Sequence, residues 1–179
     1  MTPEEFELDK STNSFVQIAL FRNVQNTKEL KAMLLSGQLE CSMINPALIL
    51  APFQIVIAVN KAVLSENQKK LTTRNVFTEV LYNLSASKNI TQSLKRFGIN
   101  EDDKSLVVVA IRKNEISSLD RVLPLISGDQ CPIGEIKSLT DITLIQKTYN
   151  VKDEELKASQ LLDSIVSRIS AKDIFTFKM

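Results

Sequence analysis

The segment Ile44–Val63 constrains the fold more than any other part of the chain, because it is the most apolar segment and yet contains two prolines. Its apolar body, Ala47–Val59, is far shorter than the roughly 20 residues that a membrane-spanning helix needs. Pro46 and Pro52 each suit the first turn of a helix, where a missing N–H costs nothing. We therefore predict two successive buried helices, the first capped by Asn45, and no membrane span.

Short runs of β-forming residues predict the strands. Phe15–Phe21 is one such run, and Leu106–Ile111 is a continuous apolar run that predicts a central strand buried on both faces. Asn75–Leu84 is a further strand candidate, because Val80, Tyr82 and Leu84 would share one side of a strand, and Glu79, Leu81 and Asn83 the other. Arg121–Ile126 could add a strand, but Pro124 restricts it to a sheet edge or a loop.

Capping signals and apolar periodicity predict four further helices. One begins at Asn26 or the next residue, where Asn26 and Glu29 have the spacing of a capping box. A short helix is capped by Asn89. The other two are expected at Asp141–Tyr149 and at Asp153–Asp173, of which the second is long and amphipathic.

These elements predict an α/β (α+β) fold with one layered domain over residues 1–179, in which helices pack on a mixed, mostly antiparallel sheet. The length fits one domain with a substantial core, and no internal repeat or linker divides it. Residues 1–13 are interpreted as a polar lead-in, and Gly128–Gly134 as a turn-rich connection.

The composition argues against several classes of protein. The net charge of +1 gives no general attraction to nucleic acid, so an RNA contact would need a local basic patch. Only two cysteines occur, Cys41 and Cys131, which argues against a disulfide framework. The acidic start, Met1–Glu7, lacks the apolar core of a secretory signal, so we expect an intracellular protein.

Catalytic chemistry has few candidates. The chain has no histidine, which removes the commonest general base and most zinc sites, and its four glycines are too dispersed for a phosphate loop. The best carboxylate cluster is Glu79 beside Lys61 or Arg74, which we interpret as a structural or surface ion pair. We therefore expect no catalytic, cofactor-binding or metal-binding residues; an enzyme that uses carboxylates and lysines is the alternative.

A small basic cluster is the candidate for a nucleic-acid contact. Its members follow one another at the end of the second proline-initiated helix and in the loop beyond it: Asn60, Lys61, Lys69, Lys70 and Arg74. Such groups could converge on a phosphate backbone. Ordinary solvated lysines are the alternative, and aromatic residues for base stacking are scarce here.

The predicted C-terminal helix carries a wide apolar stripe at helical spacing. The stripe consists of Ala158, Leu161, Leu162, Ile165, Val166 and Ile169, and Lys172 is placed mostly off it. Apolar character continues beyond the helix in Ile174, Phe175 and Phe177. The stripe could be entirely core, but its width predicts that part of it binds a partner.

Several of these segments together resemble a known family. They are the two-proline region, Thr73-Arg74, Thr78–Ser85, Lys95–Ile99 and Leu161–Asp173. In this order they are similar to the TPRKB family, whose members are the kinase-binding subunit of the KEOPS (EKC) complex. The similarity runs from about residue 15 to 174, nearly the whole chain.

The resemblance implies a non-catalytic subunit. Family members bind the small atypical kinase of the complex, and through it the other subunits, largely by hydrophobic helix surfaces near the C-terminus. It therefore points to Leu162, Ile165 and Ile169 as kinase-binding anchors. It further implies support for threonylcarbamoyladenosine modification of tRNA, in the cytoplasm and nucleus and without a membrane or cofactor.

The resemblance also raises the interest of the basic cluster. Archaeal and fungal relatives are linked to binding the single-stranded tail of tRNA. Asn60, Lys61 and Arg74 occupy the matching region and are therefore the tRNA-binding candidates.

The chain departs from the family pattern in two places. Ala51 precedes Pro52 where close relatives would have an acidic cap, which weakens the cap without removing the helix start. Residues 112–137 match the family poorly, so no function is assigned to them. A standalone RNA-binding module is a further alternative, which the near-zero net charge disfavours.

Overall fold

One antiparallel sheet lies at the centre of the computed structural model, which describes residues 2–113 and 117–174. The strand order is β1-β2-β4-β3, and β5 also pairs with β2. Because β4 occupies one edge of β2, strands β1 and β5 share its other edge. The bounds are β1 (Glu4–Glu7), β2 (Ser14–Arg22), β3 (Ser42–Ile44), β4 (Leu106–Lys113) and β5 (Asp129–Cys131).

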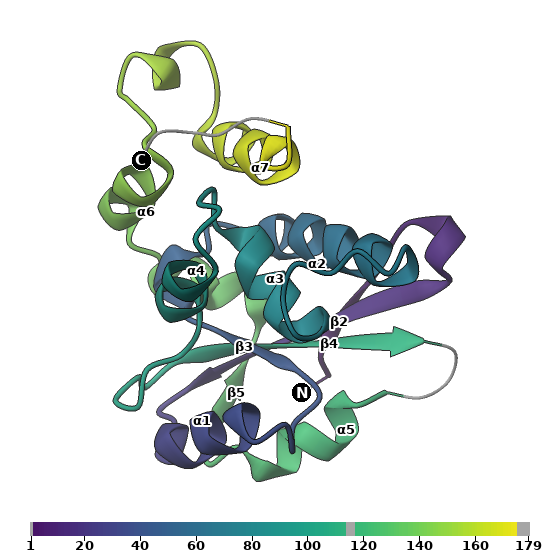
Figure 1. The fold of residues 1–179 in the computed structure, drawn as a ribbon. Coiled ribbons are helices and arrows are strands. Elements are labelled where there is room, and N and C mark those ends of the chain that lie inside the picture. The colour runs from purple at the N-terminus through teal and green to yellow at the C-terminus, as the bar shows by residue number, and fades with distance from the viewer. Residues whose placement is uncertain (1, 114–116, 175–179) are drawn as a thin grey trace.

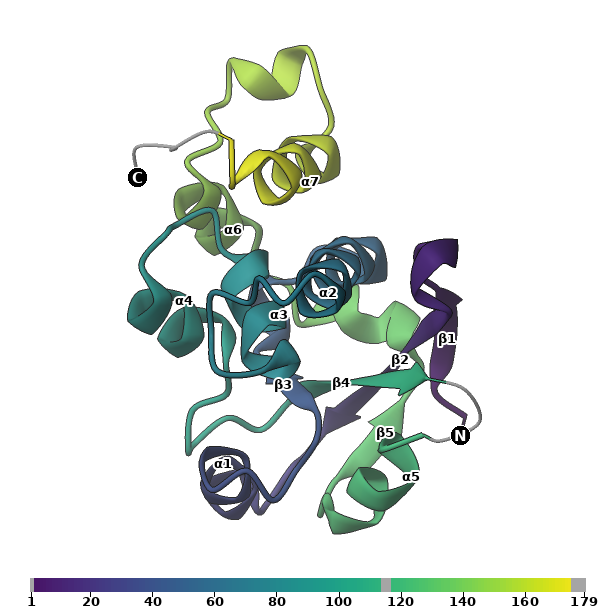
Figure 2. The same cartoon turned by 45° about the vertical axis from the view of Figure 1, so that its right-hand side comes forward.

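Helices cover both faces of this sheet (Figures 1 and 2). On one face lie α2 (Pro52–Asn67), α3 (Val76–Leu84) and α4 (Ile90–Phe97). On the other face lie α1 (Thr27–Leu35) and α5 (Leu119–Val122). The helices α6 (Ile142–Tyr149) and α7 (Leu161–Ala171) lie beyond α2 and α3, away from the sheet. Short 3-10 helices span Lys10–Thr12, Pro46–Leu48, Leu123–Leu125, Ile133–Ser138 and Glu155–Lys157.

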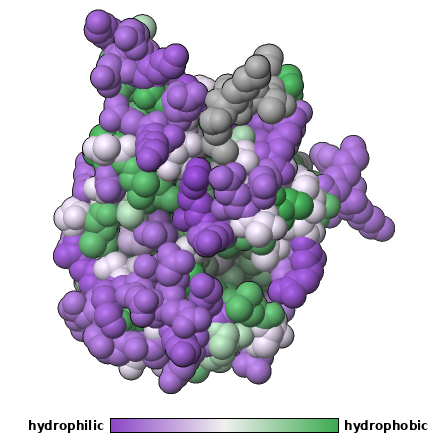
Figure 3. Space-filling model, turned by 60° about the vertical axis from the view of Figure 1, so that its left-hand side comes forward, coloured by the Kyte–Doolittle hydropathy of each residue, from purple (hydrophilic) through white to green (hydrophobic). Residues whose placement is uncertain are grey.

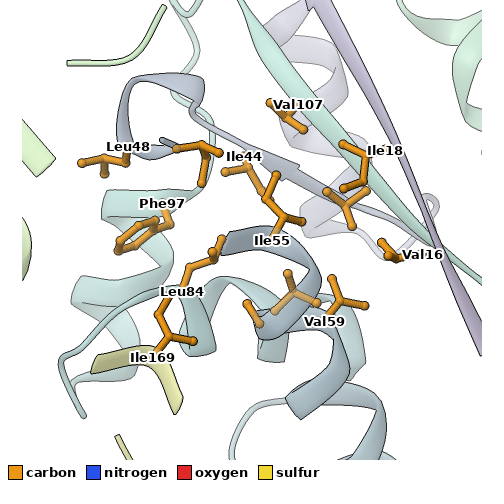
Figure 4. Packing of buried hydrophobic residues seen from close by; sticks show 14 of the residues in the cluster. Val16, Ile18, Ile44, Leu48, Ile55, Val59, Leu84, Phe97, Val107 and Ile169 are labelled. Atoms are coloured by element: carbon orange, nitrogen blue, oxygen red, sulfur yellow. The ribbon is translucent and has the colours of Figure 1, made fainter. Parts of the chain in front are cut away.

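The apolar run in β4 is buried on both faces of the sheet, as predicted. Val107 and Val109 pack into the core cluster under α2, and Val108 packs into a second cluster under α1 and α5. The larger cluster joins residues of the sheet to α2, α3 and α7 (Figure 4). The predicted α+β fold, with a mostly antiparallel sheet packed by helices, is therefore confirmed. The sheet was expected to be mixed, but every strand pair within the described residues is antiparallel.

The two-proline region folds as predicted. Asn45 Oδ1 accepts a hydrogen bond from the N–H of Ala47 at 2.9 Å, so it caps the 3-10 helix that begins at Pro46. Pro52 is the first residue of α2, and Ala51 provides no side-chain cap.

A buried glutamine ties this region to the rest of the molecule. Gln54 Nε2 donates to the carbonyl of Leu48 at 3.0 Å and to Tyr149 Oη at 2.9 Å, and Gln54 Oε1 accepts from the N–H of Leu50 at 3.0 Å. Tyr149 Oη in turn donates to the carbonyl of Leu84. Each polar group of Gln54 that burial removes from water thus has a partner, which offsets the cost of desolvation.

The prediction of a strand at Asn75–Leu84 is wrong, because this segment is the helix α3. Asn75 Oδ1 accepts from the N–H of Thr78 at 2.9 Å, and Thr78 Oγ1 accepts from the N–H of Asn75, which completes a capping box. Val76, Val80 and Leu84, four residues apart, are buried on one side of the helix.

Three other segments differ from their predicted secondary structure or bounds. Arg121–Ile126 contributes to α5 and a 3-10 helix and forms no strand. The long helix predicted from Asp153 begins only at Leu161, after a separate 3-10 helix. The lead-in of residues 1–13 contains the edge strand β1.

The start of α1 differs from the prediction, and glycines follow both α1 and α4. Asn26 makes no capping bond; its amide donates to the carbonyl of Leu125 and accepts from the N–H of Ser127 instead. Gly37 follows α1 with φ +77°, and a Cβ at Gly98, after α4, would lie 2.6 Å from the carbonyl oxygen of Leu94.

Candidate partner-binding surfaces

The three anchors predicted on α7 lie in two different environments. Ile165 and Ile169 are 0% exposed and belong to the main core cluster, where Ile169 lies next to Leu84 (Figure 4). Leu162 is partly exposed. In this conformation Ile165 and Ile169 hold α7 on the rest of the chain, and only Leu162 offers side-chain surface to a partner.

Apolar side chains beyond this stripe are exposed near α7. Ile142 and Leu144 on α6 are exposed, and Ile174 after α7 is 77% exposed. The helices α6 and α7 lie next to each other in both ribbon views (Figures 1 and 2). Apolar side chains reach the surface among polar ones on the face drawn in Figure 3. The predicted continuation through Phe175 and Phe177 lies outside the described residues.

Lys61 has a structural position. Its Nζ donates to the carbonyl of Ile169 at 2.7 Å and forms an ion pair with Asp173 Oδ2 at 2.9 Å. The carbonyl of Ile169 belongs to the last turn of α7, where unpaired C=O groups and the helix dipole favour a cation. Lys61 therefore joins α2 to the C-terminal end of α7.

The other two tRNA-binding candidates, Asn60 and Arg74, differ from each other. Asn60 Oδ1 accepts from the N–H of Asp9 at 2.8 Å, which fastens the N-terminal segment to α2. Arg74 is exposed in the loop before α3, and no hydrogen bond or ion pair holds its guanidinium within the described residues. The structure gives no contact that joins Arg74 to Asn60 or Lys61 there.

Glu79 does not form the predicted ion pair with Lys61 or Arg74. Its carboxylate is buried and accepts from the N–H and Oγ1 of Thr73, at 2.8 and 2.7 Å, and from the N–H of Thr72. These bonds satisfy the buried charge and hold the loop that leads into α3.

Sequence reasoning missed the environment of Lys172. Its side chain is buried; Nζ donates to the carbonyl of Tyr82 and lies 3.2 Å from the centroid of the Tyr82 ring. Burial lowers the pKa of Lys172 to about 7, with a smaller contribution from the charge of Lys61. The spacing Ile165, Ile169, Lys172 puts this lysine on the buried side of α7, and this signal was present in the sequence.

Two kinds of feature are absent from residues 2–113 and 117–174. No helix there is long and apolar enough to cross a membrane. No group of three histidine, cysteine, aspartate or glutamate side chains gathers there in a way that could hold a metal ion.

Exposed apolar side chains on α6 and after α7 form the kind of surface at which a protein partner binds. The model of the family described as kinase binding protein CGI-121 matches residues 21–173. The chain belongs to this family.

Individual relatives agree with this assignment. The EKC/KEOPS complex subunit TPRKB of Danio rerio is 35% identical over 156 residues, which cover 87% of this chain and 89% of the relative. The EKC/KEOPS complex subunit CGI121 of Yarrowia lipolytica is 32% identical over 140 residues, covering 76% and 79%. The corresponding subunit of Aspergillus fumigatus is 28% identical over 170 residues, covering 88% and 89%. The resemblance stated from the sequence is thus confirmed.

Proposed function

We propose that this chain is a non-catalytic subunit of a KEOPS (EKC) complex and that it binds the kinase subunit. The proposal is supported by membership of a family described as kinase binding and by relatives that are named as subunits of this complex. As such a subunit it would support threonylcarbamoyladenosine modification of tRNA through the assembly, and the chemistry would belong to other chains.

The proposed kinase-docking surface is the exposed part of α6 and α7. The observation that carries it is the exposure of Ile142 and Leu144 on α6 and of Ile174 after α7, together with the partly exposed Leu162 on the adjacent α7. Apolar side chains at the centre of an interface supply most of its binding energy once water is excluded. Ile165 and Ile169 act from inside, because they hold α7 in place.

The test is a pair of leucine-to-aspartate substitutions with matched exposure. Leu144 is 40% exposed on α6, and Leu125 is 42% exposed after α5, under the opposite face of the sheet. Leu144→Asp should weaken binding to the purified kinase subunit by about tenfold or more, measured by titration calorimetry, and Leu125→Asp should leave it unchanged. Wild-type affinity of the Leu144 variant, together with weakened binding by the Leu125 variant, would move the interface to the other face.

A weak tRNA contact is the second part of the proposal, and the observation that favours it is the exposed guanidinium of Arg74. Lys61 and Asn60 already have partners within the chain, so we expect them to contribute less. In the assembled complex, Arg74→Glu should weaken tRNA binding in a salt-dependent way. Unchanged tRNA affinity of that complex would reject the contact and leave kinase docking unaffected.

A further inference from the structure

A cavity of about 320 Å³ lies beside the terminal strand of the sheet, between α1, β3, α3 and α4. We call it the β3 pocket. Its lining is mostly apolar and includes Leu34, Leu39, Met43, Phe77, Leu81 and Ile99. Leu35, which also lines it, is 69% exposed, so the apolar surface continues outside the cavity.

More cations than anions line the β3 pocket. The charged residues of the lining are the cations Lys31 and Arg74 and the single carboxylate Glu40. Within the described residues neither Lys31 nor Arg74 has a hydrogen bond or ion pair through its side chain. The rim therefore has an excess of positive charge that nothing in the described chain neutralises, and a ligand with a carboxylate would complement it.

The shape and lining favour a peptide over a nucleobase. The only aromatic side chain in the lining is Phe77, whereas single-stranded nucleic acid is usually held on several stacking aromatics. The volume is at the small end for a ligand site and suits one large apolar side chain. The exposed Leu35 extends the apolar surface beyond the cavity, where the neighbours of that side chain in the peptide would lie.

We propose that the β3 pocket binds a short segment of a partner protein that carries a large apolar side chain next to an acidic residue. The apolar side chain enters the cavity, and the carboxylate pairs with Arg74 or Lys31 at the rim. No residue of α6 or α7 lines the cavity, so this interface is separate from the proposed kinase-docking surface and goes beyond it.

The experiment uses the full chain, labelled with ¹⁵N, and three synthetic heptapeptides. The first has the sequence Gly-Asp-Leu-Phe-Asp-Gly-Ser, the second has lysines in place of the aspartates, and the third has alanines in place of Leu-Phe. The first should shift the amide signals of pocket residues such as Met43 and Leu81. The other two should bind more weakly by about tenfold or more.

A charge-reversed variant separates recognition from a structural effect. Lys31→Glu with Arg74→Glu should invert the preference, so that the lysine peptide binds more tightly than the aspartate peptide. The matched control, Lys70→Glu with Lys95→Glu, makes the same change of net charge at exposed residues outside the lining and should keep the original preference.

Two outcomes would overturn the proposal. One is the absence of pocket shifts with the aspartate peptide up to about 5 mM, a concentration at which even weak docking is visible. The other is binding of a single-stranded RNA hexamer inside the pocket, with shifts at Met43 and Leu81, in place of the peptide. Both are distinguishable from failure of the kinase proposal, because kinase affinity is measured with variants of Leu144 and Leu125, neither of which lines the cavity.

Discussion

Lys172 lies in an environment that a lysine rarely occupies. Its ammonium group is removed from water, and its hydrogen bond to the Tyr82 carbonyl and its position over the Tyr82 ring compensate only part of that loss. The charges that face it are those of Lys61 and Lys88, which favour the neutral amine, and those of Asp173 and Glu79, which favour the cation. Desolvation is the largest of these influences on its pKa.

The first prediction concerns the pH dependence of stability. Lys172 loses its proton near pH 7 in the folded chain and near 10.5 when unfolded, so between these values the unfolded state binds the extra proton. Its contribution therefore makes the free energy of unfolding rise with pH above about 7, by at most about 1.4 kcal/mol per pH unit. Tyr82 stays protonated in this range, because burial and the charges of Asp173 and Glu79 raise its pKa above 10.0.

Urea denaturation of the wild type and Lys172→Met at several pH values between about 7 and 9.5 measures this contribution. The variant should lack the rise that Lys172 causes. Equal slopes for the two proteins would show that the lysine titrates normally in the folded chain.

At the scale of elements, α3 depends on its cap. The side chain of Asn75 and the hydroxyl of Thr78 satisfy each other's backbone N–H groups at the start of the helix. These bonds set the first turn in place over the sheet, next to the loop that Glu79 holds. The loop, the cap and the first turn are therefore expected to lose stability together.

The second prediction tests this cap. Asn75→Ala should lower the free energy of unfolding by about 1 kcal/mol, because it leaves the N–H of Thr78 without a partner. Its neighbour Arg74 is exposed and serves as the control, since Arg74→Ala should change stability by less than about 0.5 kcal/mol. Urea denaturation measures both, and equal effects of the two substitutions would contradict the role of the cap.

The sequence of α3 is compatible with both a strand and a helix. Val80, Tyr82 and Leu84 alternate as in a strand, whereas Val76, Val80 and Leu84 have the spacing of a helix, and nine residues are too few to decide between the two periods. Only the capping signal separates the two periods. Pro46, Pro52 and the six-residue apolar run of β4 fit one structure each, so those elements were predicted correctly.

At the scale of the whole molecule, α7 belongs to the core of the chain. Ile165 and Ile169 extend the cluster that begins at the sheet. Lys61 on α2 donates a hydrogen bond to a carbonyl in the last turn of α7. An apolar stripe on a helix does not reveal whether its own chain or a partner covers it, because both bury the same residue types. The assignment of the anchors therefore required the positions of α2 and α3, which lie far from α7 in the sequence.

The third prediction compares two substitutions on α7. Ile169→Ala should destabilise the whole chain by about 2–5 kcal/mol, because it leaves a cavity in the main core cluster. Leu162→Ala, at a partly exposed position, should cost less than about 1.5 kcal/mol. Thermal denaturation of both variants would contradict this view of α7 if Leu162→Ala proved the more damaging.

The arrangement of the strands also bears on self-association. An open sheet can recruit strands from other copies through the unpaired backbone of its outermost strands. Here one border consists of β1, whose sequence is Glu-Glu-Phe-Glu, and of β5, which is only three residues long; a second copy added along β1 would bring carboxylates together. At the other border β3 is only three residues long, and Gly98 bridges its last residue, Ile44. Growth of the sheet into an aggregate is thus opposed by charge on one side and by short length and cover on the other.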